Sequence, residues 1–273
     1  MENKEIKEEI MEAGKEVAKD IYEDTLKPTA KNVGGFFGTL SGFFNNVVVY
    51  PLKKLNIEYE QKAIAFERQM QEKYNNIPKE DRVEPQLHIV GPAMESLKYN
   101  IMDEDLAEMF SNLLVSNLDG KTQKLCIPAF SKIIEQLSPM DAKVYKEIMC
   151  NFKDCPIGAA SIVFAKKGTD KQYIADIPKI FLTAEIELIN NYDLALALEN
   201  LQRLGLIEIS FLEWFKDETI YETIKEKVEV KKYEKLLQNE GINDYEVKIY
   251  QKGALKTSGF SNNFAKVCLR SGK

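Results

Sequence analysis

The sequence has few of the residues from which metal centres and thiol-based redox sites are built. It contains one histidine, His88, which excludes a metal centre with several histidine ligands. None of its four cysteines forms a CxxC pair and no secretory signal precedes them, so we expect reduced thiols in a cytoplasmic protein. We therefore predict neither a bound metal nor a cofactor.

Phosphate-binding and nucleophile motifs are also missing. The chain has no GxxxxGK[ST] loop, no GxGxxG after an expected strand, no GxSxG and no HExxH. Glu104, Asp105 and Glu108 share one expected helix, where a solvated N-terminal face accounts for the three carboxylates. We therefore assign no catalytic residue and expect a protein that is not an enzyme.

An excess of basic residues is absent as well. The 273 residues include 37 Lys and Arg against 43 Asp and Glu, which gives a net charge of −6. Such an acidic balance provides no general basic surface for nucleic acid. Apolar residues make up 44% of the chain and charged residues 29%, as in a globular protein of one large or two modest domains.

One stretch lacks charge altogether. Asn32 to Leu52 reads NVGGFFGTLSGFFNNVVVYPL and lies between Lys31 and Lys53. Its 21 residues come close to the ~20 that cross a bilayer as a helix. On a helix, small residues four apart form a strip along which another helix can approach closely. The strip comprises Gly34, Gly38, Gly42 and Asn46, and a broad apolar face carries Phe36, Phe37, Leu40, Phe43, Phe44, Val47 and Val48.

The energetics of this stretch leave three interpretations open. About ten Val, Leu and Phe residues each favour insertion by roughly 0.3–0.6 kcal/mol, a gross gain of about 3–6 kcal/mol. The glycine, asparagine, serine and threonine residues offset most of that gain. The stretch is therefore a buried helix or hairpin of a soluble protein, a segment that enters a membrane conditionally, or a stable anchor.

Amphipathic helices are expected on both sides of the uncharged stretch. Residues 5–26 carry a narrow apolar stripe, and a charged helix over Leu55 to Tyr74 has the stripe Tyr59, Ala63, Phe66, Met70 and Tyr74. Further helices are expected to begin at Pro92 and near Asp103, while Pro128 should kink or split the next one. We predict a mainly α protein with a multi-helix bundle over residues 1–137.

The second half, residues 138–273, is expected to be a smaller α+β domain. A hairpin around Gly168, a helix ending at Gly205, a strand over 207–210 and a turn at Gly253 suggest a winged-helix-like arrangement. The helix that would read DNA, residues 193–204, contains only Asp193, Glu199 and Arg203 as charged residues. A helix that reads bases normally presents several basic or amide groups, so we do not expect binding to nucleic acid.

Two further segments resemble a known family. "NIPKEDRVEPQLHIVGPAMESLKYNIMDEDLAEMFSNLLVSNLDG" and "IPAFSKIIEQLSPMDAKV" are similar to the core of the bacterial Abi-alpha (abortive infection alpha) family, formerly a domain of unknown function. The similarity extends over about residues 24–268 and includes the ending "LKTSGFSNNFAKVC", while Ile127 stands where the family often has a polar residue. The shared positions to which we give a structural role are Pro85, Gly91, Pro92, Tyr99, Phe110, Asn112, Pro128 and Phe130.

The resemblance implies a role in abortive infection, in which a bacterium stops the spread of a phage by disabling itself. It supplies no catalytic residues. We expect Gly34, Gly38 and Gly42 to line a helix contact, and the neighbouring apolar residues to face the core or, in a triggered state, the inner membrane. The alternative is a soluble sensor or adaptor whose second half binds a protein partner. The partner classes left open are a phage-derived protein, a second copy of the chain and a membrane.

Overall fold

The computed structural model describes residues 35–54, 57–151, 156–169, 172–173, 180–186 and 191–269. The chain divides into two compact units. The first comprises the described residues up to Pro139 together with those from Phe264 onward, and the second comprises Met140 to Asn263. The helix predicted over residues 5–26 and the glycine at position 34 lie outside the described residues.

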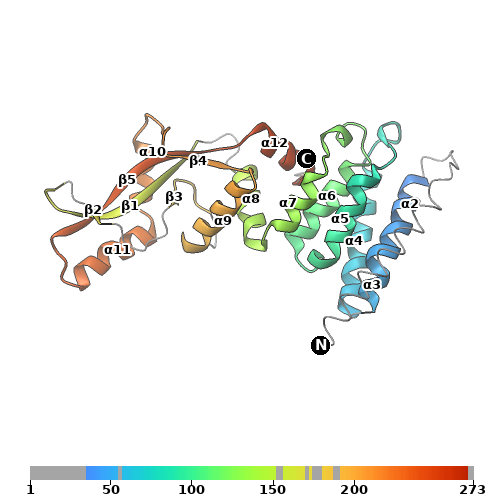
Figure 1. Ribbon diagram of the computed structural model, residues 1–273, viewed down its shortest axis with the longest axis horizontal. Helices are drawn as coiled ribbons and strands as arrows, with labels where there is room; N and C mark the ends of the chain where they lie inside the picture. Colours follow the sequence, from blue (N-terminus) through green and yellow to red (C-terminus); the bar gives the residue numbers. More distant parts are fainter. Residues whose placement is uncertain are drawn as a thin grey trace. The chain divides into compact units, whose positions relative to one another are not determined.

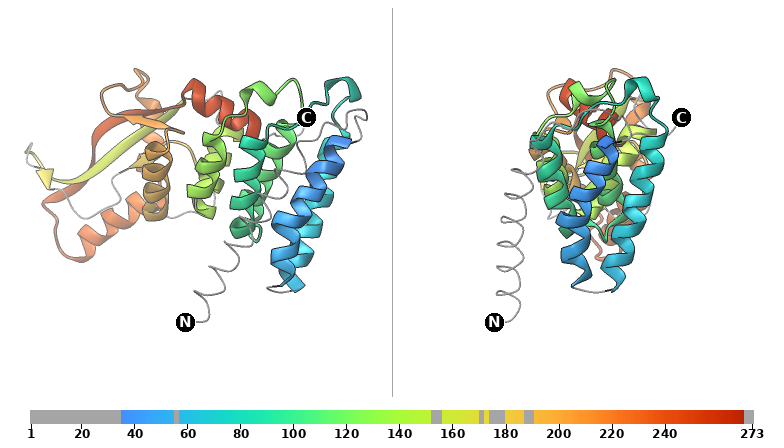
Figure 2. Two further views of the ribbon diagram at one scale, coloured as in Figure 1. Left: turned by 45° about the vertical axis from the view of Figure 1, so that its right-hand side comes forward. Right: turned by 90° about the vertical axis from the view of Figure 1, so that its right-hand side faces the viewer.

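The first unit begins with a helical hairpin (Figures 1 and 2). Its first arm runs without interruption through α2 (Gly35–Phe44), a five-residue π-helical segment η1 (Asn45–Val49) and α3 (Tyr50–Lys53). Its second arm is α4 (Ile57–Asn75), whose buried residues Ala63, Phe66, Met70 and Tyr74 belong to the predicted stripe. The described part of the uncharged stretch is therefore one arm of a helical hairpin.

In the described part of this unit the hairpin is followed by α5 (Leu87–Asn100), α6 (Glu104–Ser116) and α7 (Ala129–Gln136). The Asp103 carboxylate caps α6 by accepting a 2.8 Å hydrogen bond from the Leu106 amide. Pro128 does split the expected helix, because α7 begins directly after it and only the short turn η3 (Gln123–Leu125) precedes it. Pro92 does not begin a helix as predicted: α5 starts five residues earlier, and Pro92 lies inside it on the exposed side.

The last helix of the chain, α12 (Gly259–Cys268), ends against α6. The Asn112 side-chain amide donates to the Cys268 carbonyl at 2.9 Å, and the Ser116 hydroxyl donates to the Val267 carbonyl at 3.1 Å. The last carbonyls of a helix have no partner within the helix. Asn112 and Ser116, one turn apart on α6, therefore satisfy buried carbonyls at the end of α12.

The second unit is built on an antiparallel sheet of strand order β2-β1-β5-β4, with β3 paired to β1 (Figure 1). The hairpin predicted around Gly168 is present, since β1 pairs with β2 and Gly168 has a φ of 69°. The strands are β1 (Ile157–Lys166), β2 (Gln172–Tyr173), β3 (Phe181–Leu182), β4 (Glu208–Ser210) and β5 (Tyr245–Lys256).

The helices described in this unit are α8 (Pro139–Asn151, from its second residue onward), α9 (Asn191–Arg203), α10 (Thr219–Lys225) and α11 (Val228–Asn239). Buried residues of β1, β3, α10 and α11 form one core cluster: Ala160, Ile162, Phe181, Tyr221, Ile224 and Val230. The winged-helix prediction is not confirmed. A winged helix needs a hairpin soon after the recognition helix, whereas the strand after α9, β4, leads into α10 and α11 before β5 begins.

The turn predicted at Gly253 is wrong, because β5 continues through this residue without a break. A Cβ atom at position 253 would lie 2.5 Å from the Ser210 carbonyl oxygen and 2.9 Å from the Phe211 ring. The glycine is therefore required by the close approach of the chain after β4, and not by a change of direction.

Candidate functional site

The inner face of the uncharged helix is part of the core. Phe37 stacks on Tyr74 with ring centroids 5.0 Å apart, and Phe44 stacks on Phe66 at 5.4 Å. Predicted residues Leu40 and Phe44 are buried, together with Val47, Val48 and Leu52, and Phe43 is half-buried. The side chain of Phe36 lies outside what the structure describes. The apolar face predicted for core or lipid thus faces the core in this structure.

The outer face of the same helix has no neighbour among the described residues. A Cβ atom built on Gly38 or Gly42 would meet nothing within 4 Å in the described part of the chain. Asn46 and Tyr50 continue this strip, and Tyr50 is 61% exposed. Among the described residues, the small-residue strip is therefore an open surface with no helix packed against Gly38 or Gly42.

A polar contact joins the two arms of the hairpin beside this strip. The Glu67 carboxylate on α4 accepts hydrogen bonds from the Ser41 hydroxyl and, at 3.3 Å, from the Asn45 side-chain amide. Asn45 also donates to the Ser41 carbonyl at 2.9 Å, at the junction where α2 gives way to the π-helical segment η1. π-Helical turns often mark functional positions because they interrupt regular α-helical bonding.

The length and apolarity required of a membrane-crossing helix are not reached by any helix in the described part of the chain.

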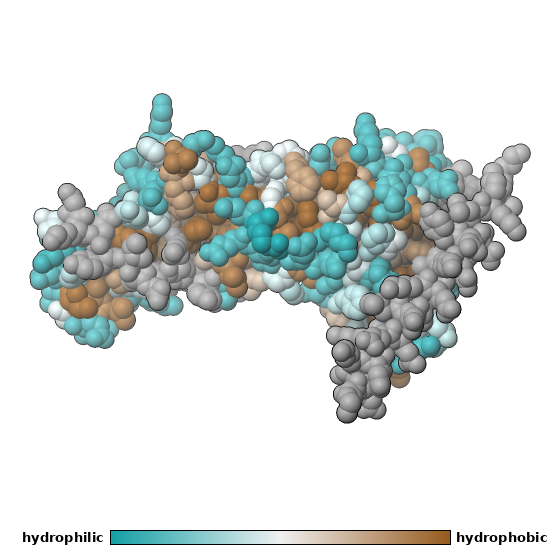
Figure 3. Space-filling view, viewed as in Figure 1, coloured by the Kyte–Doolittle hydropathy of each residue, from teal (hydrophilic) through white to brown (hydrophobic). Residues whose placement is uncertain are grey.

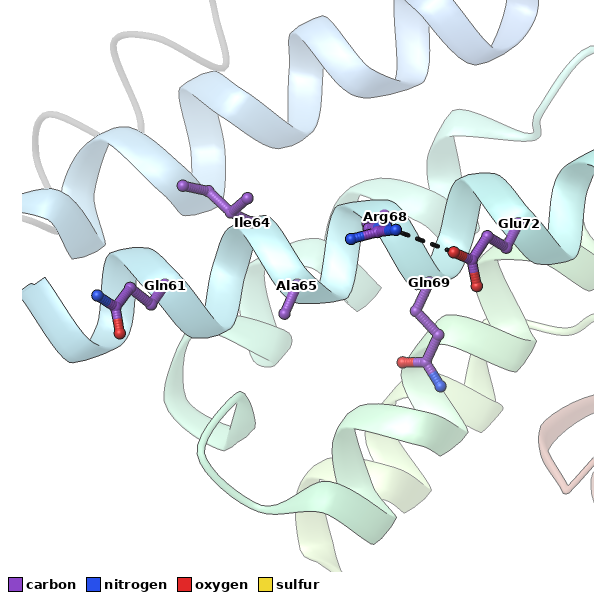
Figure 4. Close-up of a pocket in the computed structure, with 6 residues that line it drawn as sticks. All are labelled: Gln61, Ile64, Ala65, Arg68, Gln69 and Glu72. Carbon is purple, nitrogen blue, oxygen red and sulfur yellow. Dashed lines mark ion pairs between the residues drawn. The ribbon is translucent and has the colours of Figure 1, made fainter.

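The outward side of α4 carries a shallow hollow of about 370 Å³ (Figure 4). All its lining side chains come from this one helix: Gln61, Ile64, Ala65, Arg68, Gln69 and Glu72. Arg68 and Glu72 form an exposed ion pair at 3.5 Å. Catalysis needs groups that converge on one point from several elements, and this row of side chains along a helix does not provide them.

A cluster of polar groups lies between α5 and α7. The Glu135 carboxylate accepts hydrogen bonds from the Lys132 ammonium at 2.7 Å and from the Ser96 hydroxyl at 2.9 Å, and these hydrogen bonds lower its pKa. Burial raises the pKa of the nearby Tyr99, and the Glu95 and Glu135 carboxylates raise it further. Tyr99 is nevertheless 66% exposed, and the cluster lines neither of the two hollows on α4 and beside α11.

His88 is exposed and lies on the first turn of α5, seven residues before Glu95 in the sequence. Within the described ranges, no three His, Cys, Asp or Glu side chains are grouped so that they could hold a metal ion.

Three of the predicted family positions, Phe110, Asn112 and Phe130, are buried. Phe110 and Phe130 are fully buried, and Phe130 contacts Phe264 edge to face with centroids 5.2 Å apart. Asn112 also accepts a hydrogen bond from Lys73 at 2.7 Å, so its side-chain amide joins α4, α6 and α12. The remaining positions, Pro85, Gly91, Pro92, Tyr99 and Pro128, are half-buried or exposed.

A surface that the sequence analysis missed lies in the second unit, in the loop after β4. Leu212 is 89% exposed and Trp214 is 58% exposed. The Phe215 amide donates to the Tyr221 hydroxyl at 3.0 Å, and this hydroxyl donates to the Gly253 carbonyl at 2.8 Å, which fixes the loop. The sequence feature that could have indicated this surface is the single tryptophan of the chain, which lies next to charged residues. Figure 3 shows another apolar area in brown where Figure 1 places α11, whose Leu236 is 51% exposed.

Comparison with known proteins identified one family. The model of the family described as "abortive infection alpha" matches residues 58–268, which is most of the chain. This match is shorter than the resemblance read from the sequence, because it begins inside α4 and leaves the uncharged helix outside. No curated protein and no solved structure matches the chain. The chain belongs to the abortive infection alpha family.

Proposed function

We propose that this protein acts in abortive infection without enzymatic activity, and that its effector element is the uncharged stretch, whose described part is the helix from Gly35 to Leu52. The observation that carries the proposal is the division of this helix into two faces. Its inner face is buried against α4, while its outer face presents Gly38, Gly42 and Asn46 to open space in the described structure. In the resting state the helix is a core element, and in the triggered state it contacts the inner membrane.

The packing of the inner face explains why a trigger is needed. Six buried side chains hold the helix: Phe37, Leu40, Phe44, Val47, Val48 and Leu52. At about 1.5–3 kcal/mol each, their burial contributes on the order of 9–18 kcal/mol. A whole domain is stable by only about 5–15 kcal/mol. Spontaneous release is therefore rare, and an infection signal must supply binding energy that offsets the loss.

The outer face supplies the test, because it offers room for side chains in the described structure. A Cβ atom at Gly38 or Gly42 would meet no described atom within 4 Å, and leucine would remove two unfavourable helix glycines. Close helix packing in a membrane needs small residues at these positions. We therefore expect Gly38→Leu with Gly42→Leu to abolish protection against phage in a plaque assay, while Gly38→Ala with Gly42→Ala retains it.

Two measurements complete this experiment. Gln69→Leu adds a leucine to the exposed side of α4 and is the matched control for surface apolarity. Cell fractionation before and after infection should recover the wild-type protein with membranes only after infection. Full protection by the leucine variant, or recovery in the soluble fraction throughout infection, would refute the proposal.

The Leu212–Trp214 loop favours a second candidate function, a soluble adaptor that binds a protein. Exposed tryptophan on a loop already fixed by hydrogen bonds is typical of residues that contribute most of the binding energy at interfaces. Under this function, Leu212→Ser with Trp214→Ser should abolish protection while the glycine variants remain active. The opposite result would favour the uncharged helix.

A further inference from the structure

The strand β5 has one edge that is largely unpaired in the described structure. Along one side it pairs with β1 over nearly its whole length, from Tyr245 to Leu255. Along the other side it pairs with β4 only at Ala254, Leu255 and Lys256 (Figure 1). Backbone groups on such an edge can pair with a further strand.

A bulge limits how much of this edge is regular. Ser161 lies opposite Gln251 and Ile162 lies opposite Ile249, so Tyr250 is the extra residue on β5. Nearer β4, the approach of Ser210 and Phe211 to Gly253 closes the edge. The regular part of β5 that β4 does not reach is therefore Tyr245–Ile249, with the sequence YEVKI.

The two faces of this short segment differ in chemistry. Val247 and Ile249 pack against the core cluster beneath α10 and α11. Glu246 and Lys248 alternate with them, form an ion pair at 2.9 Å, and have 40% and 49% of their side-chain surfaces exposed. A strand that adds to this edge must supply apolar side chains on one face and opposite charges on the other.

We propose that the strand that adds to this edge is β5 of a second copy, paired antiparallel about a two-fold axis at Val247. In this register Glu246 of each copy lies opposite Lys248 of the other, which gives two pairs of opposite charge. Tyr245 of each copy lies opposite Ile249 of the other. Moving the axis by one residue would place Glu246 opposite Glu246, or Lys248 opposite Lys248. Like charges directly opposite each other destabilise a sheet, so the charges select the register at Val247. The inference does not rest on the proposed role of the uncharged helix.

Sedimentation equilibrium of the full-length chain tests the pairing. The wild-type protein should form a dimer. Lys248→Glu places a carboxylate opposite Glu246 of the other copy in both pairs, and should raise the dissociation constant of the dimer about tenfold. Glu246→Lys combined with Lys248→Glu restores both complementary pairs and should restore the dimer. A wild-type monomer at every concentration, or a double variant as weak as Lys248→Glu, would overturn the proposal.

Disulfide formation tests the register. Directly opposed residues have Cα atoms about 4.5–5.5 Å apart, within the range that a disulfide spans. In a background with Cys150 and Cys155 changed to serine, Val247→Cys should therefore cross-link two copies. Lys248→Cys is the matched control, since its two Cα atoms would be about 8 Å apart given a rise of about 3.4 Å per residue. Cross-linking at position 248 without cross-linking at 247 would exclude this register.

Discussion

Asn112 shows how much one polar side chain contributes to the first unit. It donates to the Cys268 carbonyl and accepts from Lys73, and it is buried. A buried hydrogen bond contributes little net stability when it forms. Removing one of its partners destabilises the fold by more than that, because the other partner stays buried without a hydrogen bond or water. We expect Asn112→Ala to lower the free energy of unfolding by about 2–3 kcal/mol and Ser116→Ala by about 1 kcal/mol, measured by urea denaturation.

Ser111 provides the matched control for this prediction. Its hydroxyl is fully buried and has no hydrogen-bond partner in the described structure. Ser111→Ala should therefore leave stability unchanged or raise it. Burial also raises the pKa of the Cys268 thiol well above its usual value, so this thiol should be alkylated slowly in the wild type and faster in Asn112→Ala. Equal losses of stability at positions 111 and 112 would contradict the assigned hydrogen bonds.

The pairing of Asn112 with the end of α12 could not be predicted from the sequence. The resemblance to the family marked position 112, but no local pattern connects it with a carbonyl 156 residues away. The aromatic residues Phe110 and Phe130 were predicted as structural for the same reason and are indeed buried. Sequence patterns indicate which side chains are buried, whereas their partners depend on how distant segments meet.

Among the helices and strands, predictions from the spacing of apolar residues were more accurate than predictions of turns and helix ends from glycine and proline. The stripe on α4 was correct because four successive apolar positions share one buried face. Gly205 ends α9 with a φ of 71°, as expected of a helix terminus. Gly253 was misread because a turn and a close backbone approach favour the same residue, and only the structure distinguishes them.

Gly253 and Gly38 should therefore respond oppositely to alanine. The Gly253→Ala methyl group would overlap the Ser210 carbonyl oxygen, which cannot move without disturbing β4, and overpacking typically costs about 1–3 kcal/mol. Gly38→Ala enters open space on a helix and should stabilise by about 0.5–1 kcal/mol. Thermal denaturation of the two variants measures both effects, and a stable Gly253→Ala protein would contradict the close approach.

At the scale of the molecule, the sequence placed a division after residue 137, and the structure divides the chain after Pro139. The return of residues 264–269 to the first unit was not expected, because composition changes along a chain mark linkers but not segments that fold back. The winged-helix prediction is not confirmed. The order of helices and strands was partly right, but strand pairing between β1 and β5 spans most of the second unit and leaves no local signal.

Both units contain carboxylates whose contribution to stability should be lost in acid. Hydrogen bonds from Lys132, Thr219 and Lys231 lower the pKa values of Glu135, Asp217 and Glu226 respectively. A lowered pKa in the folded state stabilises the fold above the ordinary values, 4.5 for Glu and 3.8 for Asp, and this contribution is lost as the pH falls through the lowered values.

Changing Glu135 and Glu226 to glutamine and Asp217 to asparagine should therefore reduce the urea midpoint at pH 7 and have little effect once the wild-type carboxyls are protonated. The loss should be modest, because exposed pairs contribute little. Glutamine at Glu84, Glu208 and Glu240 gives the same change in net charge and separates this effect from general repulsion. A difference between wild type and the first variant that stays constant as the pH falls would show that these hydrogen bonds do not act through the charged carboxylates.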